Sequence, residues 1–430
     1  MFLISSKGAS IDILSTAKSG YFLFKFLPEH SYLIKMSFCL MYSKEIPEWE
    51  FKERIKRLQR ELKTRNLDVV LVHSNEAEFA NVRYLADYWP AFESAGVVVP
   101  IDGEPILLVG PESEEYARDR SKIKKIMKLL EYRESAEPEY PGVKVYSFKD
   151  VFEEAVGDIK KIKRVGIIGY AIMPFIIYES LRKTLPEAEL IKADDILKNL
   201  RAVKSENEIA CLKEASRVSE IAIEKVMEEI RPGMTELQVV GIAQRAMYEN
   251  GAEYEGHPLY VLSGKNSRHA ISRPTHKKIR EGELIQLNIG ARVSGYSSSI
   301  GRPICLGKMS PKMKMLVEAG LELHIETKEL LKAGVPAKEV AENFIKRAER
   351  KGVGQNILYG PCHGIGLMEC EPPWIELTSN YDLKENMTFQ VDTFLYTEDF
   401  GLRWEDGVRV TKHGVEAFCT KWEEILEFAR

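Results

Sequence analysis

Four segments in the C-terminal half of the chain carry side chains that could bind a cation or transfer a proton. They are a strand–turn–strand pattern at residues 279–307, a Gly-rich loop with His363 at 360–375, an amphipathic strand with Asp392 at 384–396, and a hairpin with Arg403, Glu405 and Asp406 at 402–414. Each segment alone has an ordinary explanation, such as a turn glycine or a strand-end carboxylate. Histidine and carboxylates are also the side chains that hold metal ions and act as general acids and bases. The four segments together, in this order, predict one shared site.

The elements that must position these residues follow from the hydrophobic pattern. Residues 49–195 alternate helical segments with strand-like runs such as DVVLVHS, VRYLADYW and RVGIIG, which predicts a separate α/β domain. A linker is predicted near residues 196–204, and Ser205 and Glu208 after it have the spacing of a capping box. Further helices are predicted up to Pro232–Gly233, at 235–252 and within about 310–350.

Composition limits the class of protein. The chain has 430 residues, and its 61 basic and 65 acidic side chains give a net charge of −4. This length suits two domains, and the charge offers no basic footprint for nucleic acid. No tract reaches the roughly 18 apolar residues that a membrane-spanning helix needs. Six cysteines without a CxxC pair predict reduced thiols in a cytoplasm.

The first 40 residues differ in pattern from the rest of the chain. They mix apolar and basic side chains without a secretory pattern, because lysines interrupt the short apolar runs. We interpret this segment as a misassigned start, with Met36 or Met41 as the natural first residue. A flexible extension or a small packed addition is the alternative.

In their order along the chain, the motifs resemble those of the creatinase/prolidase/methionine aminopeptidase family, which is peptidase family M24. The resemblance covers about residues 49–430 and rests on LRAVKSENEIACLKEA, RPGMTE, HGIGL with a following EPP, and RWEDGVRVT. It implies an α/β plus α+β fold class. A creatinase/prolidase-like N-terminal domain would span residues 41–200, and a pita-bread hydrolase domain would span 201–430.

The resemblance also implies where metal ligands would lie. The family's metallopeptidases hold two divalent cations with two Asp, one His and two Glu, and the matching positions here are Asn288, Ser299, His363, Asp392 and Glu405. Two cations about 3.5–4 Å apart depend on bridging carboxylates, and the carboxylates here fall from four to two. We therefore expect no dinuclear centre and no cofactor. The alternative is one divalent ion on the histidine and the two remaining carboxylates.

A metal-free relative suggests the reaction. Creatinase hydrolyses a C–N bond of a small guanidino compound with a histidine as acid/base and a glutamate that holds the cationic substrate. It also has an asparagine at the position of Asn288. The resemblance therefore implies a creatinase-type hydrolase that cleaves a C–N bond in a small cationic or zwitterionic substrate, with Glu405 fixing the positive group.

The position of the proton carrier is less clear from the sequence. A gapless comparison places Ile271 where the family's catalytic histidine is expected. His269 lies two residues earlier and would share a face with Ile271 in an extended segment. We therefore take His269 and His363 as candidate acid/base residues, and His257 and His276 as weaker candidates.

Other side chains are candidates for contacts with the substrate. Asp392 and Glu405 would present an anionic patch, in which one carboxyl would have a raised pKa. The remaining candidates are Asn288, Arg403, Tyr88, Trp89 and Glu93, of which the last three follow a family segment that reaches the partner's active site in dimers. Ordinary packing is an equal explanation for these three. Cys362 and Cys370, which replaces a second family histidine, are interpreted as packed thiols rather than nucleophiles.

Two other functions stay open. One is an Xaa-Pro dipeptidase or aminopeptidase that works with a single metal, which the retained His363, EPP and RWED segments favour. The other is a non-catalytic pita-bread module that binds peptides or proteins. In each case we expect a cytoplasmic homodimer with a small-molecule or dipeptide ligand and without nucleic-acid or membrane partners.

Overall fold

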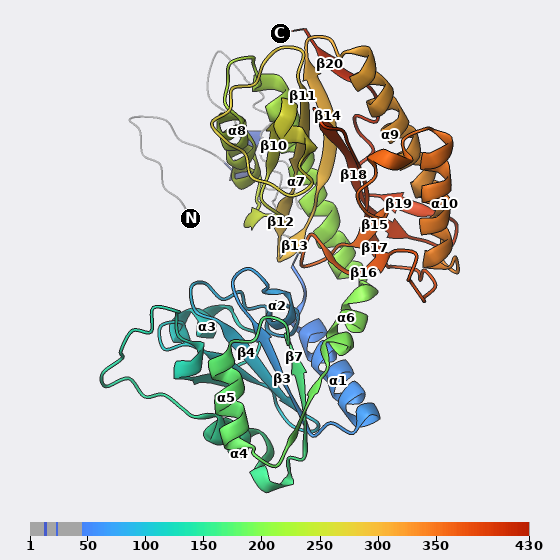
Figure 1. The fold of residues 1–430 in the computed structure, drawn as a ribbon. Helices are drawn as coiled ribbons and strands as arrows, with labels where there is room; N and C mark the ends of the chain where they lie inside the picture. The colour runs from blue at the N-terminus through green and yellow to red at the C-terminus, as the bar shows by residue number, and fades with distance from the viewer. Residues whose placement is uncertain (1–12, 15–22, 25–44, 430) are drawn as a thin grey trace, which may run out of the picture. The chain divides into compact units, whose positions relative to one another are not determined.

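The computed structural model describes residues 13–14, 23–24 and 45–429, and it divides into two compact units, Met1–Ser43 and Lys44–Arg430 (Figure 1). In the first unit, β1 (Ile13–Leu14) pairs antiparallel with β2 (Leu23–Phe24). Apart from these strands, the interpretation of residues 1–40 falls outside the described residues. No helix in the described part is both long and apolar enough to cross a membrane.

The first half of the large unit is built on a six-stranded mixed sheet. Its order is β6 (Ile126–Lys128), β5 (Ile106–Val109), β4 (Ala95–Pro100), β3 (Val69–Ser74), β7 (Arg164–Ile168) and β8 (Glu189–Lys192). Successive side chains of β3 enter opposite cores: Val70 and Val72 join one cluster, and Val69 and Leu71 join the other. This alternation follows from the period of a strand and explains why β3 is continuously apolar.

Helices cover both faces of this sheet (Figure 1). One core contains residues of α1 (Glu48–Arg65), α2 (Ala80–Ala86) and α6 (Asp194–Ala202), and the other contains residues of α4 (Phe148–Val156) and α5 (Phe175–Thr184). The helices α3 (Glu114–Arg120), η1 (Leu130–Tyr132) and η2 (Ile159–Lys161) complete this half. Two expectations were wrong in detail. VRYLADYW is mainly helical, in α2, and the predicted linker is mostly α6, because Ile196 and Leu197 are buried in the first core.

The second half is built on a nine-stranded sheet. Its main order is β10 (Tyr260–Ser263), β11 (Leu284–Ile289), β14 (Ile300–Leu306), β18 (Gly401–Val410), β17 (Thr388–Tyr396), β15 (Cys362–Gly364) and β16 (Glu371–Ile375). β19 (Val415–Ala417) pairs with β18, and β20 (Leu426–Phe428) pairs with β14. A separate small sheet has the strand order β13 (Tyr296–Ser297), β12 (Ala291–Val293) and β9 (Tyr254–Glu255). The pairing of β18 with β19 confirms the predicted final hairpin.

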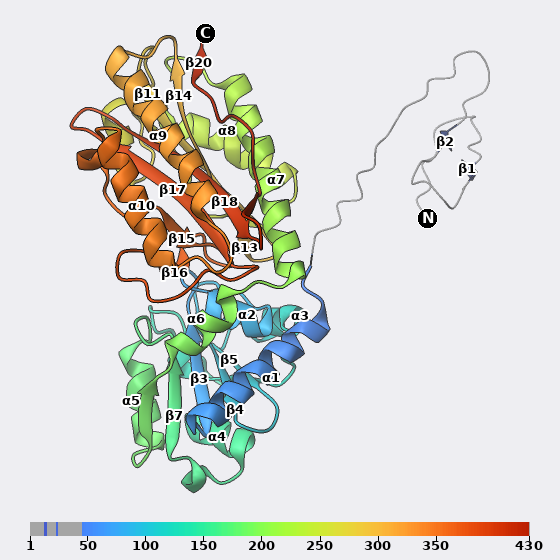
Figure 2. The same cartoon turned by 90° about the vertical axis from the view of Figure 1, so that its right-hand side faces the viewer.

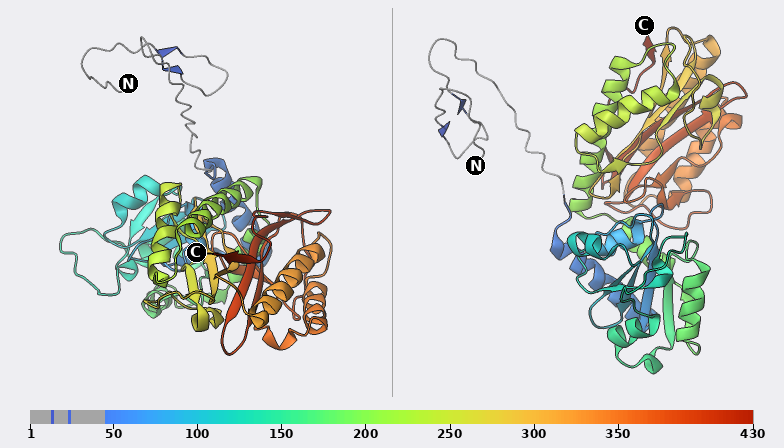
Figure 3. Two further views of the ribbon diagram at one scale, coloured as in Figure 1. Left: turned by 90° about the horizontal axis from the view of Figure 1, so that it is seen from above. Right: turned by 90° about the vertical axis from the view of Figure 1, so that its left-hand side faces the viewer.

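Two helix pairs pack on the strands of this half (Figures 2 and 3). They are α7 (Glu206–Glu229) with α8 (Glu236–Glu249), and α9 (Pro311–Leu330) with α10 (Ala337–Arg350); η3 (Gly264–Arg268) and η4 (Gly354–Asn356) are short turns. The capping box predicted at Ser205 and Glu208 opens α7, and Thr235 caps α8. On β18, Leu402 and Trp404 enter the core with α9, which leaves the alternate residues for the opposite face.

His73 of β3 gives a pH-dependent stability prediction. Both ring nitrogens of this buried side chain lack a hydrogen-bond partner, and burial lowers its pKa from 6.5 to about 4. In the unfolded chain His73 therefore becomes protonated below pH 6.5, whereas in the folded chain it stays neutral down to about pH 4. We expect stability to fall across this window by about 3 kcal/mol more than in His73→Leu, at 1.36 kcal/mol per pH unit. Urea unfolding of both proteins at pH 7, 5.5 and 4.5 measures this, and parallel pH profiles would contradict it.

Candidate functional site

The strand register places three of the candidate positions, Asn288, Glu405 and Asp392, in one row across the large sheet. Asn288 on β11 pairs with Gly301 on β14, Gly301 pairs with Glu405 on β18, and Glu405 pairs with Asp392 on β17. Asn288 and Glu405 therefore meet although they are 117 positions apart in the chain. On the next strand, β15, His363 pairs with Gln390, two positions from Asp392.

A histidine and two carboxylates form the centre of the site. Each of His363, Asp392 and Glu405 offers an atom that could bind a metal, and these atoms all lie within 4.8 Å of one another. The three side chains are buried. His363 Nδ1 lies 3.1 Å from Gly364 O and carries a hydrogen, so Nε2 is the nitrogen that offers a lone pair when the ring is neutral. Nε2 lies 3.8 Å from Glu405 Oε1 and 3.8 Å from Glu369 Oε1.

Asn288 and Ser299 fill the opposite side of Glu405. Asn288 Nδ2 donates to Glu405 Oε2 at 2.6 Å, and Ser299 Oγ lies 2.6 Å from Asn288 Oδ1 and 3.0 Å from Glu405 Oε2. His257, which precedes β10, joins them with its Nε2 at 3.1 Å from Ser299 Oγ. The structure brings Asn288, Ser299 and Glu405 together as the sequence predicted, and it adds His257, which was only a weaker candidate.

Arg403 and Tyr359 hold the outer side of Asp392. Arg403 Nε forms an ion pair with Asp392 Oδ1 at 3.1 Å, and Tyr359 OH donates to Asp392 Oδ2 at 2.7 Å. Arg403 Nη2 donates to Tyr359 OH at 2.7 Å and to Ala270 O at 2.9 Å. Arg403 was expected near the substrate, whereas Tyr359 was missed. Its only sequence signal was a polar aromatic residue four positions before His363.

The buried charges shift one another's pKa values. Burial raises the pKa of Glu405 well above its ordinary value, and the charges of Asp392 and Glu369 raise it further. Burial likewise raises the pKa of Glu369 to about 7. Burial alone would lower the pKa of His363, but the Cys370 sulfur and the nearby carboxylates raise it to about 9. The carboxyl groups of Glu405 and Glu369 therefore hold their protons to a higher pH than isolated carboxyl groups do.

The donor set fits one metal ion but not two. Asn288 and Ser299 supply no carboxylate, and the Asn288 amide is already bonded to Glu405. One imidazole nitrogen with two carboxylates is a reasonable face for a single divalent ion. A second group, His324, Asp406 and Glu423, also has suitable atoms. It already holds cations, because Lys328 contacts both carboxylates and Arg302 Nη2 lies 2.7 Å from Asp406.

The structure does not bring the other predicted proton carriers into this cluster. His269 is exposed at the end of η3, where its backbone N–H donates to Asn266 O. Ile271 is 88 % exposed, and His276 is exposed in the following loop. His269 has extended backbone directly after the 3-10 turn, but no hydrogen bond or ion pair of the described residues joins its side chain to the cluster. Its catalytic role stays a prediction without support from a contact.

The remaining candidates pack within this chain. Tyr88 is buried against Tyr116, and Trp89 packs on Phe79 and Tyr254 while its Nε1 donates to Glu76 O. Glu93 accepts hydrogen bonds from the backbone of Glu112 and from Ser113. These contacts are ordinary packing, and a role at a partner's site stays a prediction. Cys362 is buried and Cys370 is exposed, and burial raises the pKa of Cys362 well above its ordinary value.

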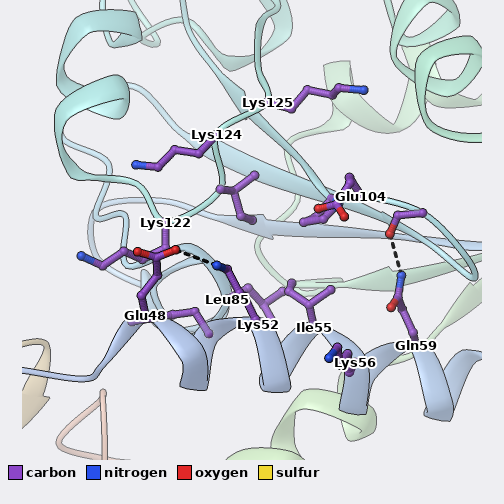
Figure 4. Close-up of a pocket in the computed structure, with 14 residues that line it drawn as sticks. Glu48, Lys52, Ile55, Lys56, Gln59, Leu85, Glu104, Lys122, Lys124 and Lys125 are labelled. Carbon is purple, nitrogen blue, oxygen red and sulfur yellow. Dashed lines mark hydrogen bonds and ion pairs between the residues drawn. The ribbon is translucent and has the colours of Figure 1, made fainter.

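Two cavities lie outside this cluster. One of about 500 Å³ lies between α1 and residues 103–105 and 122–125, with five lysines and an apolar floor (Figure 4). Several of its lysines already have partners, such as Lys52 with Glu48 at 2.8 Å. The other, of about 440 Å³, is lined mostly by apolar residues, with Glu376 and Thr378 among them, and by Tyr359, whose hydroxyl binds Asp392.

Comparison with known proteins places this arrangement in a family. Residues 54–203 match the creatinase/prolidase N-terminal domain, and residues 210–412 match metallopeptidase family M24. An Xaa-Pro dipeptidase of Pyrococcus furiosus is 27% identical over 377 residues, which is 87% of this chain and 100% of the relative. An Xaa-Pro dipeptidase of Pyrococcus horikoshii is 28% identical over 378 residues, with 87% and 99% covered.

Solved structures agree. The X-Pro aminopeptidase of Thermotoga maritima has a TM-score of 0.76 at 25% identity, with 87% of this chain and 99% of that one covered. The prolidase of Pyrococcus horikoshii has a TM-score of 0.75 at 25% identity, with 87% and 100% covered. The family and the fold class that the sequence predicted are thus confirmed. The chain belongs to metallopeptidase family M24, in the creatinase/prolidase group.

Proposed function

We propose that this protein hydrolyses the C–N bond of a small dipeptide-like substrate and that it uses one divalent ion rather than two. The observation that carries this is the buried group of His363, Asp392 and Glu405, which offers three ligand atoms within 4.8 Å of one another. The similar proteins are Xaa-Pro dipeptidases and prolidases, and they favour the peptidase alternative over the creatinase-type reaction. A cytoplasmic homodimer is part of the same proposal.

The residues of the site would have different roles in this reaction. When bound, the ion would supply Lewis-acid polarisation of the scissile carbonyl. Glu405 accepts hydrogen bonds on Oε2, which leaves Oε1 toward His363. Arg403 and Tyr359 fix the orientation of Asp392. The apolar cavity beside Tyr359 gives room for an apolar side chain or ring of the substrate.

Metal content and activity test this proposal together. The purified chain would be stripped with chelator, titrated with Mn²⁺, Co²⁺ or Zn²⁺, and assayed on Xaa-Pro and other dipeptides. We expect activity to rise to a plateau at one ion per chain and to be lost on chelation. Two tightly held ions per chain, or peptidase activity that survives complete chelation, would contradict the single-ion proposal.

The creatinase-type reaction remains the second candidate because one observation favours it. The site contains an internal cation, Arg403, whose ion pair with Asp392 lowers the need for a metal. If this reaction is the true one, chelated protein should hydrolyse guanidino or cyclic-amide compounds and ignore dipeptides. If no compound is hydrolysed while peptides still bind, the chain is a binding module.

Restoring two carboxylates should restore the second ion. In Asn288→Asp with Ser299→Asp, the site again has a carboxylate at each metal position, so we expect uptake to rise from one to two divalent ions per chain. Elemental analysis of dialysed protein measures the ratio. Asn288→Asp alone is the control and should stay closer to one ion. An unchanged ratio of ions per chain in the double variant would contradict this prediction. It would mean that the pairing of Arg403 with Asp392 leaves no room for a second ion.

A further inference from the structure

Ser299 differs from the two serines that precede it. Residues 297–299 are three consecutive buried serines. Ser297 Oγ donates to Leu367 O at 3.1 Å, and Ser298 Oγ lies 3.2 Å from Ala291 O and 2.7 Å from Ser219 Oγ. These contacts satisfy the backbone around the turn. Of the three, only Ser299 faces a histidine, an amide and a carboxylate, so the structural role of its neighbours does not explain it.

His257 is oriented as a base toward Ser299. Its Nδ1 lies 2.7 Å from Pro258 O, and because a carbonyl oxygen can only accept, Nδ1 carries the hydrogen. Nε2 therefore keeps its lone pair, and it lies 3.1 Å from Ser299 Oγ. A nucleophile, a base and a group that orients the base are the three parts that an activated serine needs. Asn288 Oδ1 at 2.6 Å and Glu405 Oε2 at 3.0 Å are two further acceptors within reach of the rotating hydroxyl, and they position it beside His257.

Two glycines allow His257 and Ser299 to lie this close together. An added Cβ on Gly290 would lie 1.9 Å from Ser298 O, and one on Gly256 would lie 2.5 Å from the same atom. Gly256 N also donates to Gly290 O at 2.7 Å. A larger residue at either position would push the segment that carries His257 away from the turn that carries Ser299. The close contact of the two side chains is therefore built into the backbone.

We propose that Ser299 is the nucleophile of this site and that His257 is its general base, an inference that rests on the proposed amide hydrolysis. A site that fits one ion has no water bridged between two ions, which leaves the role of nucleophile open to a side chain of the site. Ser299 Oγ forms a bond to the carbonyl carbon of the scissile amide while its proton passes to His257 Nε2. The C–N bond then breaks, and that proton passes to the departing nitrogen.

The acyl group is left as an ester on Ser299. Water adds to its carbonyl carbon and gives a proton to His257. The ester C–O bond breaks, the proton returns to Ser299 Oγ, and the carboxylic acid leaves. The step therefore consumes one water, and both side chains return to their starting states.

Covalent labelling tests the proposal without a known substrate. The full chain is incubated with a fluorophosphonate, which phosphonylates activated serines, and the labelled position is mapped by peptide mass spectrometry. We expect the label on Ser299 and on neither Ser297 nor Ser298. In His257→Gln, labelling should slow by about 10²–10⁴-fold, as for the loss of a general base. Ser298→Ala is the matched control and should label at the rate of the unchanged protein.

The outcomes separate this proposal from the function it rests on. Labelling of Ser299 in a chain that hydrolyses no dipeptide would keep the nucleophile and overturn the peptidase. Dipeptide hydrolysis that persists within a few-fold in Ser299→Ala would keep the peptidase and overturn the nucleophile. Absence of label at Ser299 in the unchanged protein, which needs no variant to fold, overturns the nucleophile whatever the activity.

Discussion

His363→Ala should lower turnover of an identified substrate by about 10²–10⁴-fold, the usual cost of losing a group that moves a proton or holds the reacting centre. Its Nε2 is the imidazole nitrogen in the buried group with Asp392 and Glu405, and its Nδ1 is already committed to Gly364 O. Removing it also removes a ligand, so metal affinity should fall with turnover. Steady-state kinetics and metal titration of the same preparation measure both.

His269→Ala is the paired variant that decides between the two histidines. His269 is exposed and makes no side-chain contact with the cluster among the contacts of the described residues, so we expect kcat within a few-fold of the unchanged protein. A loss as large as that in His363→Ala would restore the assignment made from the sequence. Full activity in both variants would leave the proton to His257 or to a carboxyl group.

Glu371→Gln should destabilise the fold by about 3–5 kcal/mol, because it leaves two buried cations without their counter-ion. Glu371 lies on β16 and accepts from Arg201 and, at 3.0 Å, from Lys204, and all three side chains are buried. Burial alone would raise the pKa of Glu371, but the two cations hold it below its ordinary value. Urea unfolding at pH 7 measures the change.

The exposed pair of Lys52 and Glu48 is the control for this prediction. Both side chains are largely in solvent, where an ion pair contributes little, so Glu48→Gln should unfold at the urea concentration of the unchanged protein. A Glu371→Gln variant that is equally stable would mean that water reaches Arg201 and Lys204. That result would also remove the reason for the low pKa of Glu371.

The sequence was most informative where a motif fixes a short strand. His363, Asp392 and Glu405 were predicted to meet because each lies in a motif that resembles the family's, and the register of β17 with β18 pairs two of them directly. Glu369 was missed because the pairing of β15 with β16 shifts after His363, so alternation could not be followed along that loop. No local pattern marks such a shift.

The contact of His257 with Ser299 was not predicted, for a different reason. It depends on the close approach of two glycine-containing turns that are far apart in the chain, and a periodic pattern does not encode this. His269 was chosen because an extended segment was assumed for residues 269–271, and in the structure His269 is exposed directly after the 3-10 turn of residues 264–268. Both residues lie in loops, whose paths are set by tertiary contacts rather than by periodicity.

The ion pairs of Glu371 have a mechanical consequence for the catalytic half. Arg201 lies in the last turn of α6 and Lys204 in the connection to α7, and Glu371 lies on β16, which pairs with the strand of His363. Arg54 of α1 likewise bonds Tyr296 of the second half. These contacts join the first half to strands beside the site, so we expect a substitution that loosens the first half to lower activity as well as stability.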